Sequence, residues 1–290
     1  MPEEFIKSRQ NPRVKTLMKL QERSARRKLG LFTVEGLREL SRCAEKFPMD
    51  EIYFCPEFFK SREHEEFLEK IRREKQIPLC RLSASAFEKV SNRQGCDGLL
   101  GVAKQWDTSL SGIKLKKDSP ALVMIVDSIE KSGNLGALAR TADSFGADAI
   151  IITNAVCDIF NPSVIRASQG AVFSIQIAVA DVPECLEWLK ANKIRSFGAH
   201  LRAEKDLWNA DFSAPSAIVM GSEKDGLGAD WENVLDEKII IPMSDGLSDS
   251  MNVNVAAAVC LYEAKRSRFF SCGATNTKVA EGKLLGEALE

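Results

Sequence analysis

The chain has 290 residues, with 40 Lys and Arg against 41 Asp and Glu, so its formal net charge is −1. An apolar fraction of 44% and a charged fraction of 28% are typical of globular proteins and exclude a collagen, a coiled-coil rod or a disordered tail protein. No apolar run approaches the ~18 residues that a membrane-spanning helix needs. The first residues, Met1-Pro2-Glu3-Glu4, lack the basic-then-apolar pattern of a secretory signal. We therefore expect a cytoplasmic protein with no membrane partner, and the length favours two domains.

The eight cysteines are scattered, with none in a C-x-x-C pair, and the only histidines are His64 and His200. A structural zinc site needs Cys and His ligands clustered at short spacing, so the sequence predicts no metal site. Reduced and mostly buried thiols are the expected state of these cysteines. With two distant histidines, the sequence gives no sign of a Ser–His or Cys–His nucleophile.

The near-zero net charge hides a basic N-terminal segment. Residues 1–30 contain nine Lys and Arg against three Glu. Such a local excess attracts the phosphates of nucleic acids even when the whole chain is neutral. The alternative is a solvated helix face that only confers solubility, and composition alone leaves both interpretations open.

Residues 1–106 have the pattern of a small α/β unit. A helical pattern starts at Asn11-Pro12 and runs through Leu17 and Leu20 to a basic turn at residues 26–28. A strand at 31–34, a helix opening at Glu35-Gly36, a strand at 51–54 and a charged helix around 61–75 follow. Further strand candidates are 77–79 and 99–103, with a turn-rich loop at 91–98 between them. The polar residues 107–119 predict a linker to a second domain.

From residue 120 the pattern changes to short apolar runs separated by helical segments. Several runs are continuous rather than alternating, as in strands covered on both faces, so we expect a mainly parallel sheet flanked by helices. The predicted strands are 121–126, 149–153, 173–179, 194–199, 217–220 and 238–241, and the predicted helices are 136–145, 162–168, 183–192 and 252–268. This second domain spans 120–268, and we expect the tail at 269–290 to be poorly ordered or docked as a late helix.

Three segments stand out at the ends of predicted strands, where open α/β sheets bind ligands. The first, Asn134–Gly146, follows the strand ending at Asp127. The helix predicted there has an apolar stripe along one face, and Arg140 points away from that face. A guanidinium placed there suits an anionic partner such as phosphate. The alternative is a surface ion pair with Asp143, and the spacing leaves both open.

The second segment, residues 219–228, runs from a strand into a Gly-rich turn that contains Glu223. It matches neither a P-loop nor a dinucleotide-binding loop, because Leu227-Gly228 and Trp231 stand where those motifs need other residues. This argues against a dehydrogenase, although an ordinary strand-to-helix turn would look the same. In the third segment, residues 241–258, a strand leads through a polar loop to a helix of small residues. Ser250 and Asn252 there are candidate helix caps.

Together and in this order, the three segments resemble the SpoU/TrmH branch of the SPOUT RNA methyltransferases. The matches are N-x-G-x-x-x-R-T-A-x-x-F-G at 134–146, G-S-E-x-x-G-L at 221–227, and I-P-M at 241–243 followed by S-x-N-V-x-V-A-A at 250–257. The first third is similar to the ribosomal-protein-L30e-like RNA-binding domain that often precedes this catalytic domain, through its S-R-Q-N-P-R-V-K opening and Val34-Glu35-Gly36. Met251 and Asn254 depart from the family pattern, which usually has Leu and Ser there.

The resemblance implies a SPOUT-type parallel α/β sheet whose C-terminal segment is threaded into a trefoil knot, and a homodimer with the active site near the subunit interface. It implies S-adenosylmethionine as cofactor and a 2′-O-methylated ribose in RNA as product. The implied cofactor pocket is lined by Gly221, Ile241, Met243, Met251 and Asn252. The implied substrate is 23S-type ribosomal RNA. A transfer-RNA 2′-O-methyltransferase of the same family and a non-catalytic ribosome-assembly protein are the alternatives.

The resemblance also assigns roles to individual residues. Arg140 would act on the ribose 2′-hydroxyl, either as a base or by stabilising the developing alkoxide, because arginine is normally always protonated. Four polar residues would orient Arg140, the RNA or the knot loops: Asn134, Glu223, Ser250 and Asn252. The basic N-terminal segment would bind the RNA backbone, with four candidate contacts: Arg9, Lys15, Arg26 and Arg27.

Overall fold

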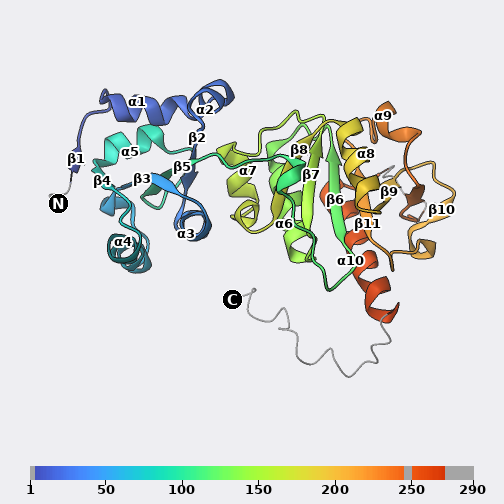
Figure 1. Ribbon diagram of the computed structural model, residues 1–290. Helices are drawn as coiled ribbons and strands as arrows, with labels where there is room; N and C mark the ends of the chain where they lie inside the picture. The colour runs from blue at the N-terminus through green and yellow to red at the C-terminus, as the bar shows by residue number, and fades with distance from the viewer. Residues whose placement is uncertain (1–3, 245–249, 272–290) are drawn as a thin grey trace.

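The computed structural model describes residues 4–244 and 250–271 and places them in two α/β units side by side (Figure 1). The first unit has a five-stranded sheet in the order β1-β4-β3-β5-β2, with β5 antiparallel to both its neighbours. Its strands are β1 (Glu4–Ile6), β2 (Leu31–Glu35), β3 (Met49–Phe54), β4 (Leu79–Leu82) and β5 (Leu99–Lys104). Its helices are α1 (Pro12–Lys19), α2 (Arg23–Leu29), α3 (Leu37–Lys46), α4 (Glu63–Glu74) and α5 (Ala84–Val90), with a short 3-10 turn, η1 (Pro56–Phe58).

The helical pattern predicted from residue 12 to the basic turn at 26–28 is two helices in the structure. Asn11 begins α1, since its side chain accepts a hydrogen bond from the backbone N–H of Arg13 at 2.9 Å. The helix stops at Leu20, and Glu22 has extended backbone before α2 begins. The guanidinium of Arg26 binds the carbonyl oxygens of Leu20 and Gln21, and so satisfies acceptors at the break.

The second unit has a seven-stranded sheet in the order β10-β12-β9-β11-β6-β7-β8, in which every pair is parallel. This confirms the predicted parallel α/β sheet. Its strands are β6 (Leu122–Asp127), β7 (Ala149–Thr153), β8 (Gln176–Ala180), β9 (Arg195–Ala199), β10 (Lys205–Asp206), β11 (Ser216–Met220) and β12 (Glu237–Ile240). Its helices are α6 (Ser132–Ser144), α7 (Pro162–Ala167), α8 (Val182–Ala191), α9 (Ala229–Glu232) and α10 (Val253–Ser271), with 3-10 turns η2 (Leu110–Gly112), η3 (Ala171–Phe173) and η4 (Leu207–Asn209).

Strand β6 explains why the apolar runs of this unit are continuous. Its alternate residues pack into two different cores: Met124 and Val126 on the side of α6, α7 and α10, and Val123 and Ile125 on the side of α8 and α9. The strand predicted at 173–179 is partly wrong, because residues 171–173 form η3 and β8 starts at Gln176. Residues 171–173 are apolar and buried although they form a turn. A short apolar run in a sequence does not show whether its residues form a buried turn or a buried strand.

The carboxyl ends of the parallel strands lie along one edge of the sheet, the upper edge in Figure 1. The three motif segments therefore leave the sheet at the same edge. Helix α10 continues past its predicted end, and Arg268 anchors it by donating to the carbonyl oxygens of Phe212, Pro120, Ala121 and Ala214. The rest of the predicted tail, 272–290, lies outside the described residues, as does 245–249 of the third motif. Within the described ranges, no helix has both the length and the apolar character needed to cross a membrane.

Candidate active site

A cavity of about 370 Å³ opens at the carboxyl edge of the sheet, where the three motif segments meet. Its walls come from the loop after β11, the end of β12, the first turn of α6 and the residues that lead into α10. The end of β9 supplies a further wall through Ala199, His200 and Leu201. The cavity therefore joins segments that lie more than a hundred residues apart in the chain.

A chain of side-chain hydrogen bonds links the three motifs beside this cavity. Asn134 on α6 donates from its Nδ2 to Oε1 of Glu223 in the Gly-rich turn. The Oδ1 of Asn134 accepts from Nδ2 of Asn254 on α10 at 3.0 Å. Asn254 also donates to Oδ1 of Asn252 at 3.1 Å. One amide thus connects a carboxylate in the second motif to the helix of the third.

Glu223 is held as a carboxylate by its surroundings. Desolvation by burial opposes ionisation, but the hydrogen bond from Asn134 and bonds from backbone N–H groups outweigh it and lower the pKa of the Glu223 carboxyl. The nearby ammonium of Lys131 acts in the same direction. Glu223 therefore accepts hydrogen bonds at neutral pH and does not act as an acid there.

The turn after β11 is closed by backbone contacts. Ser222 and Gly226 exchange hydrogen bonds between their backbones, at 2.8 and 3.2 Å, and Gly226 has φ 70°. A Cβ atom on Gly221 would overlap the backbone of Gly226, so only glycine fits at this position. The absence of a side chain on these glycines leaves backbone groups of the turn facing the cavity.

Asn252 begins helix α10. Its Oδ1 accepts a hydrogen bond from the backbone N–H of Asn254 at 2.9 Å, and its carbonyl oxygen accepts from Ala256 at 3.0 Å. This is the cap geometry that the sequence pattern predicted for Asn252. Its position as the helix cap holds the preceding residues, Ser250 and Met251, against the cavity.

Most of the predicted site residues line the cavity together. All five predicted cofactor contacts do so: Gly221, Ile241, Met243, Met251 and Asn252. The predicted orienting residues Asn134, Glu223 and Ser250 are also in its wall. The walls contributed by Ala199, His200 and Leu201 were missed, because a strand was predicted at 194–199 but no motif marked its end.

Arg140 is the exception among the predicted site residues. It lies on α6, six residues after Asn134 and thus about 9 Å further along the helix axis, and it does not line the cavity of its own chain. Its side chain is exposed and has no hydrogen-bond or ion-pair partner within the described residues, so the alternative ion pair with Asp143 does not form. The guanidinium of Arg140 is thus free to meet an anion from outside.

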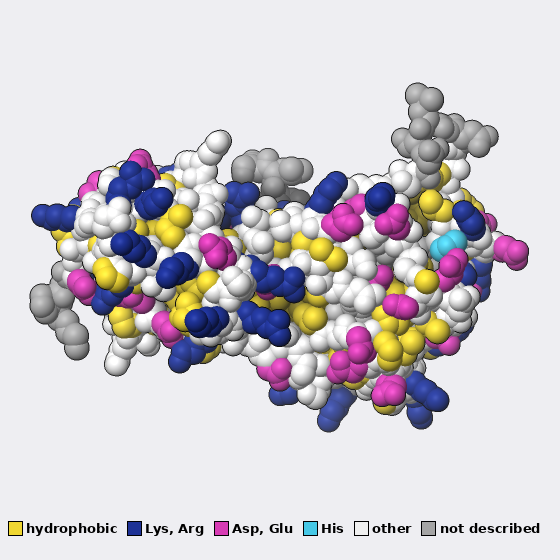
Figure 2. All heavy atoms as spheres, turned by 90° about the horizontal axis from the view of Figure 1, so that it is seen from above, with side chains coloured by type: hydrophobic (Ala, Val, Ile, Leu, Met, Phe, Trp, Pro, Cys, Tyr) yellow, Lys and Arg dark blue, Asp and Glu magenta, His cyan; other side chains and the backbone are white. Residues whose placement is uncertain are grey.

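Three of the four predicted RNA contacts are exposed on the first unit: Arg9, Lys15 and Arg27. Figure 2, which looks down on the upper face, shows Lys and Arg side chains more densely over the first unit and the junction than over the far end of the second unit. The prediction for Arg26 is wrong. Its side chain is 1% exposed and its guanidinium binds Asp158 at 2.6 Å, so it lacks the access to solvent that an RNA contact needs.

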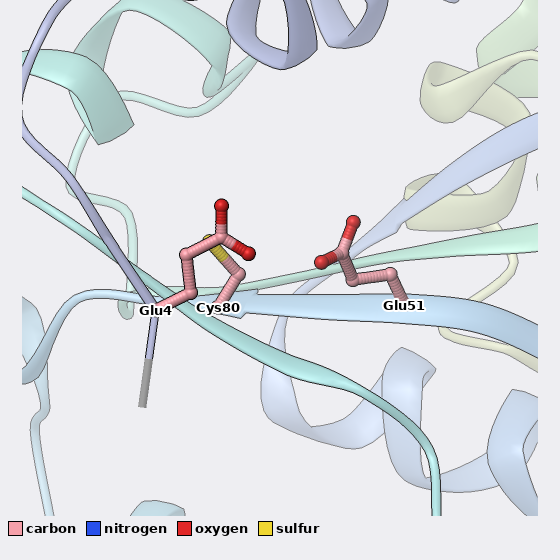
Figure 3. Close-up of side chains that lie close together, drawn as sticks. All are labelled: Glu4, Glu51 and Cys80. Carbon is pink, nitrogen blue, oxygen red and sulfur yellow. The ribbon is translucent and has the colours of Figure 1, made fainter. Parts of the chain in front are cut away.

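One group of metal-type ligands in the described part of the chain lies away from the cavity. Glu4, Glu51 and Cys80 bring ligand atoms within 4.8 Å of one another. Figure 3 shows the three side chains on neighbouring strands. The guanidinium of Arg13 already pairs with both carboxylates, at 2.9 and 3.1 Å. Burial raises the pKa of the Cys80 thiol to about 11, so it is not a thiolate at neutral pH. The two glutamates are therefore best described as the ion-pair partners of Arg13 rather than as ligands of a metal ion.

Comparison with known proteins places this architecture among RNA-modifying enzymes. Residues 121–262 match the model of the SpoU rRNA Methylase family, and residues 11–101 match that of the MRM3-like substrate binding domain. A 23S rRNA (uridine(2479)-2′-O)-methyltransferase of Streptomyces viridochromogenes is 28% identical over 88% of this chain and 90% of its own. The 23S rRNA (guanosine-2′-O-)-methyltransferase RlmB of Xanthomonas campestris is 31% identical over 69% of this chain and 82% of its own.

Solved structures share the whole arrangement. The crystal structure of an RNA 2′-O ribose methyltransferase aligns with a TM-score of 0.78 and 33% identity, over 91% of this chain and 99% of that one. The fold is also shared with the SpoU methyltransferase AviRb of Streptomyces viridochromogenes in complex with AdoMet, with a TM-score of 0.81 and 24% identity over 90% and 99% of the two chains. The chain belongs to the SpoU rRNA methylase family.

Proposed function

We propose that this protein transfers a methyl group from S-adenosylmethionine to a ribose 2′-hydroxyl in RNA, and that the RNA is 23S ribosomal RNA. The observation that carries the proposal is the meeting of all three motifs at one cavity, joined through Asn134 to Glu223 and Asn254. The choice of RNA is supported by the relatives that align over most of both chains. These include the 23S rRNA (guanosine(2553)-2′-O)-methyltransferase RlmP of Bacillus subtilis, 28% identical over 90% of this chain and 98% of its own.

The cavity fits the proposed cofactor. Its volume of about 370 Å³ lies within the range of roughly 300–1,000 Å³ that small-molecule sites occupy. Gly221 presents backbone groups because no side chain fits there, while Ile241, Met243 and Met251 offer apolar surface and Asn252 a polar side chain. When bound, the cofactor supplies an electrophilic methyl group on a sulfonium centre. The residues of this chain then have to hold that group and align the ribose oxygen with it.

Arg140 is the proposed residue for the ribose hydroxyl. A guanidinium placed there would stabilise the developing alkoxide and bind the adjacent phosphate. Its exposure and lack of a partner among the described residues support this role. Asn134, Glu223, Ser250 and Asn252 are proposed to orient the RNA and the loops around the cavity.

We propose a homodimer, because Arg140 does not line the cavity of its own chain. Helix α10 has an outward stripe of Val255, Val259 and Tyr262, in which Val255 is 51% and Tyr262 59% exposed. The ring of Phe145, the residue that follows α6, meets that of Tyr262 edge-on, so the end of α6 lies against α10 at this surface. A second copy packed there would cover the stripe and bring Arg140 near an active site at the subunit interface.

The finer points of the fold belong to the same proposal. They are a trefoil knot in the C-terminal segment, an L30e-like first domain at 1–106, a linker at 107–119, a methyltransferase domain at 120–268 and a tail at 269–290, in a protein of the cytoplasm. The return of the chain after β12 to Asn134 supports the knot. The match of residues 11–101 to a substrate-binding domain supports an RNA-binding first domain, with Arg9, Lys15 and Arg27 as contacts.

The test is transfer of tritium from labelled S-adenosylmethionine to total RNA from cells that lack this protein, followed by fractionation and digestion to nucleosides. We expect label in one 2′-O-methylnucleoside of 23S rRNA. Label in a transfer-RNA fraction would support the alternative of a tRNA 2′-O-methyltransferase. Absence of both label and cofactor binding would support the non-catalytic RNA-binding protein.

A further inference from the structure

An ion pair between a buried arginine and a partly buried aspartate joins the two units of the chain. Arg26, on α2 of the first unit, bonds to Asp158, in the loop between β7 and α7 of the second. In Figure 1 helix α2 lies at the end of the first unit that faces α7. The two residues are 132 positions apart in sequence. The pair is therefore a tertiary contact between units, and it stands apart from the cavity.

The guanidinium of Arg26 is held in one orientation. Its Nε and Nη2 donate to the same oxygen of Asp158, at 2.8 and 2.6 Å. Its Nη1 donates to the carbonyl oxygens of Leu20 and Gln21, at 2.9 and 2.8 Å. The other oxygen of Asp158 accepts from the backbone N–H of Phe160 at 3.0 Å. Four directed bonds from one planar group fix angles as well as distance.

Around this pair the units share an aromatic cluster. Phe32 and Trp106 pack on Phe160, with ring centroids 5.2 and 4.5 Å apart, and Phe47 packs on Phe173 at 5.8 Å. Such apolar contacts hold surfaces together but are not directional. Relative motion is the default for two domains in one chain, so directed bonds between them restrict their angle. Arg23 and Arg42 each donate one exposed bond to the second unit, to the carbonyl oxygens of Val156 and Gln169 at 3.0 and 2.9 Å, whereas the bonds of Arg26 are shielded from solvent.

The loop that carries Asp158 does not line the cavity, but Glu130 links it to the cavity wall. Asn154 donates to the buried carboxylate of Asp127 at 2.9 Å, and the Sγ of Cys157 lies 2.8 Å from the carbonyl oxygen of Glu130. The backbone of Glu130 in turn donates to Glu223. A short run of bonded residues therefore connects helix α2 to the wall of the cavity.

We propose that Arg26 and Asp158 are positioning residues that fix the RNA-binding surface of the first unit at a set distance and angle from the methyl-transfer cavity, and so determine which nucleotide of the folded RNA is methylated. The inference rests on the proposed function. A buried ion pair is weak evidence for stability, because desolvation offsets its attraction, whereas it does restrict geometry. The RNA would be read by shape from the first unit, and the target ribose would be the one that this geometry presents to the cavity.

The experiment compares the full-length protein with the double variant Arg26→Met, Asp158→Leu, which removes both charges and leaves no unpaired one in the interior. The methylated nucleotide in 23S rRNA is mapped, and kcat and KM are measured on the same RNA. We expect methyl groups at nucleotides other than the wild-type target and a loss in kcat of about 100-fold, the scale of a misplacement of roughly 1 Å. The dissociation constant for S-adenosylmethionine alone should not change.

The matched control is Arg27→Ala, next to Arg26 in sequence but exposed. It should raise KM for the RNA and leave the methylated nucleotide unchanged. Small-angle X-ray scattering gives a readout without activity: the double variant should have a larger maximum dimension than the wild type. Arg26→Lys keeps the positive charge but not the planar fork that makes the four bonds, so it should also methylate nucleotides other than the wild-type target. It serves as a second variant if the double variant does not fold.

The possible outcomes distinguish a failure of the positioning role of Arg26 and Asp158 from a failure of the proposed methyltransferase function. If the wild type methylates one nucleotide and both variants methylate it alone with unchanged kcat, with only their melting temperatures lowered, Arg26 and Asp158 are structural and the inference is overturned. If the wild type transfers no methyl group to any RNA, the proposed function itself fails, and the scattering comparison alone then reports whether the pair sets the arrangement of the units.

Discussion

The side-chain amide of Asn254 donates to Oδ1 of Asn134 at 3.0 Å, across 120 positions of sequence. This bond ties the first helix of the second unit to its last, and Asn134 extends it to Glu223. Because an amide donates and accepts at once, a single residue type can join a carboxylate to a second amide. The wall of the cavity therefore depends on three side chains that act as one unit.

Asn134→Ala should reduce activity strongly, because it breaks both bonds and frees Glu223 and Asn254. We expect kcat/KM for RNA methylation to fall by about 100-fold, as for a loss of alignment at the reacting groups. Steady-state kinetics on 23S rRNA measure the effect. Asn192→Ala, at an exposed helix end, is the matched control and should leave kcat/KM unchanged. Equal effects of the two substitutions would contradict a special role for Asn134.

The carboxylate of Glu223 should make folding stability depend on acid pH. Its pKa is lower in the folded protein than the ordinary value of 4.5, despite opposing burial, so ionised Glu223 stabilises the fold above that pH. As pH falls through the lowered pKa, this contribution is lost. The free energy of unfolding of the wild type should thus exceed that of Glu223→Gln at about pH 6, and the difference should shrink as the pH falls below 4.5. A difference that is constant with pH in urea titrations would refute the lowered pKa.

Arg140→Ala should abolish most of the activity without affecting the fold, because the side chain is exposed and unpaired within the described residues. Loss of a single electrostatic stabiliser lowers kcat by about 100- to 1,000-fold. Calorimetry should give an unchanged affinity for S-adenosylmethionine. Arg166→Ala, an exposed arginine on α7, provides the control. Near-normal turnover of a folded Arg140→Ala protein would remove Arg140 from the mechanism.

Gly221→Ala should disrupt the turn after β11, because the new Cβ would overlap the backbone of Gly226. Forcing a methyl group into such a space costs about 1–3 kcal/mol of stability. We also expect weaker binding of S-adenosylmethionine, measured by calorimetry. The same change at Gly112, where a Cβ meets open space, should be tolerated. If Gly221→Ala bound the cofactor normally, the turn would not contribute to the cavity as described.

RNA binding should weaken steeply with salt, and the exposed basic residues of the first unit should account for part of the slope. Lys15→Ala and Arg27→Ala each remove one cation that can neutralise a phosphate, so each should reduce the slope of log K against log salt by about 0.7–0.9. Lys190→Ala, exposed on α8, should leave the slope unchanged. Filter binding at several salt concentrations measures it. A slope insensitive to the first two substitutions would exclude these residues as contacts.

The strands of the second unit could be predicted from sequence, because residues buried on both faces form continuous apolar runs, as in β6. Strand β10 could not be predicted, because it has only two residues, Lys205 and Asp206, which are too few to show a hydrophobic periodicity. The motifs identified which segments carry the site, and eight of the predicted residues line the cavity. The bond from Asn254 to Asn134 could not be predicted, because it depends on how distant helices pack.

The neighbouring residues Arg26 and Arg27 also show that a sequence pattern does not predict a contact between distant segments. Both lie in a run of three basic residues, and charge patterning treats them alike. In the structure Arg27 is exposed, whereas Arg26 turns inward to Asp158. The partner that decides this lies in the other unit, so no local pattern could have separated the two residues.

Mass spectrometry of unmodified 23S rRNA tests the central claim most directly, after incubation with the purified protein and S-adenosylmethionine that has a deuterated methyl group. The account predicts one nucleoside with the heavy methyl group on its ribose 2′-oxygen, and none when Arg140→Ala replaces the wild type. A heavy methyl group on a base, or none on any RNA although the cofactor binds, would contradict the claim that this cavity methylates ribose in ribosomal RNA.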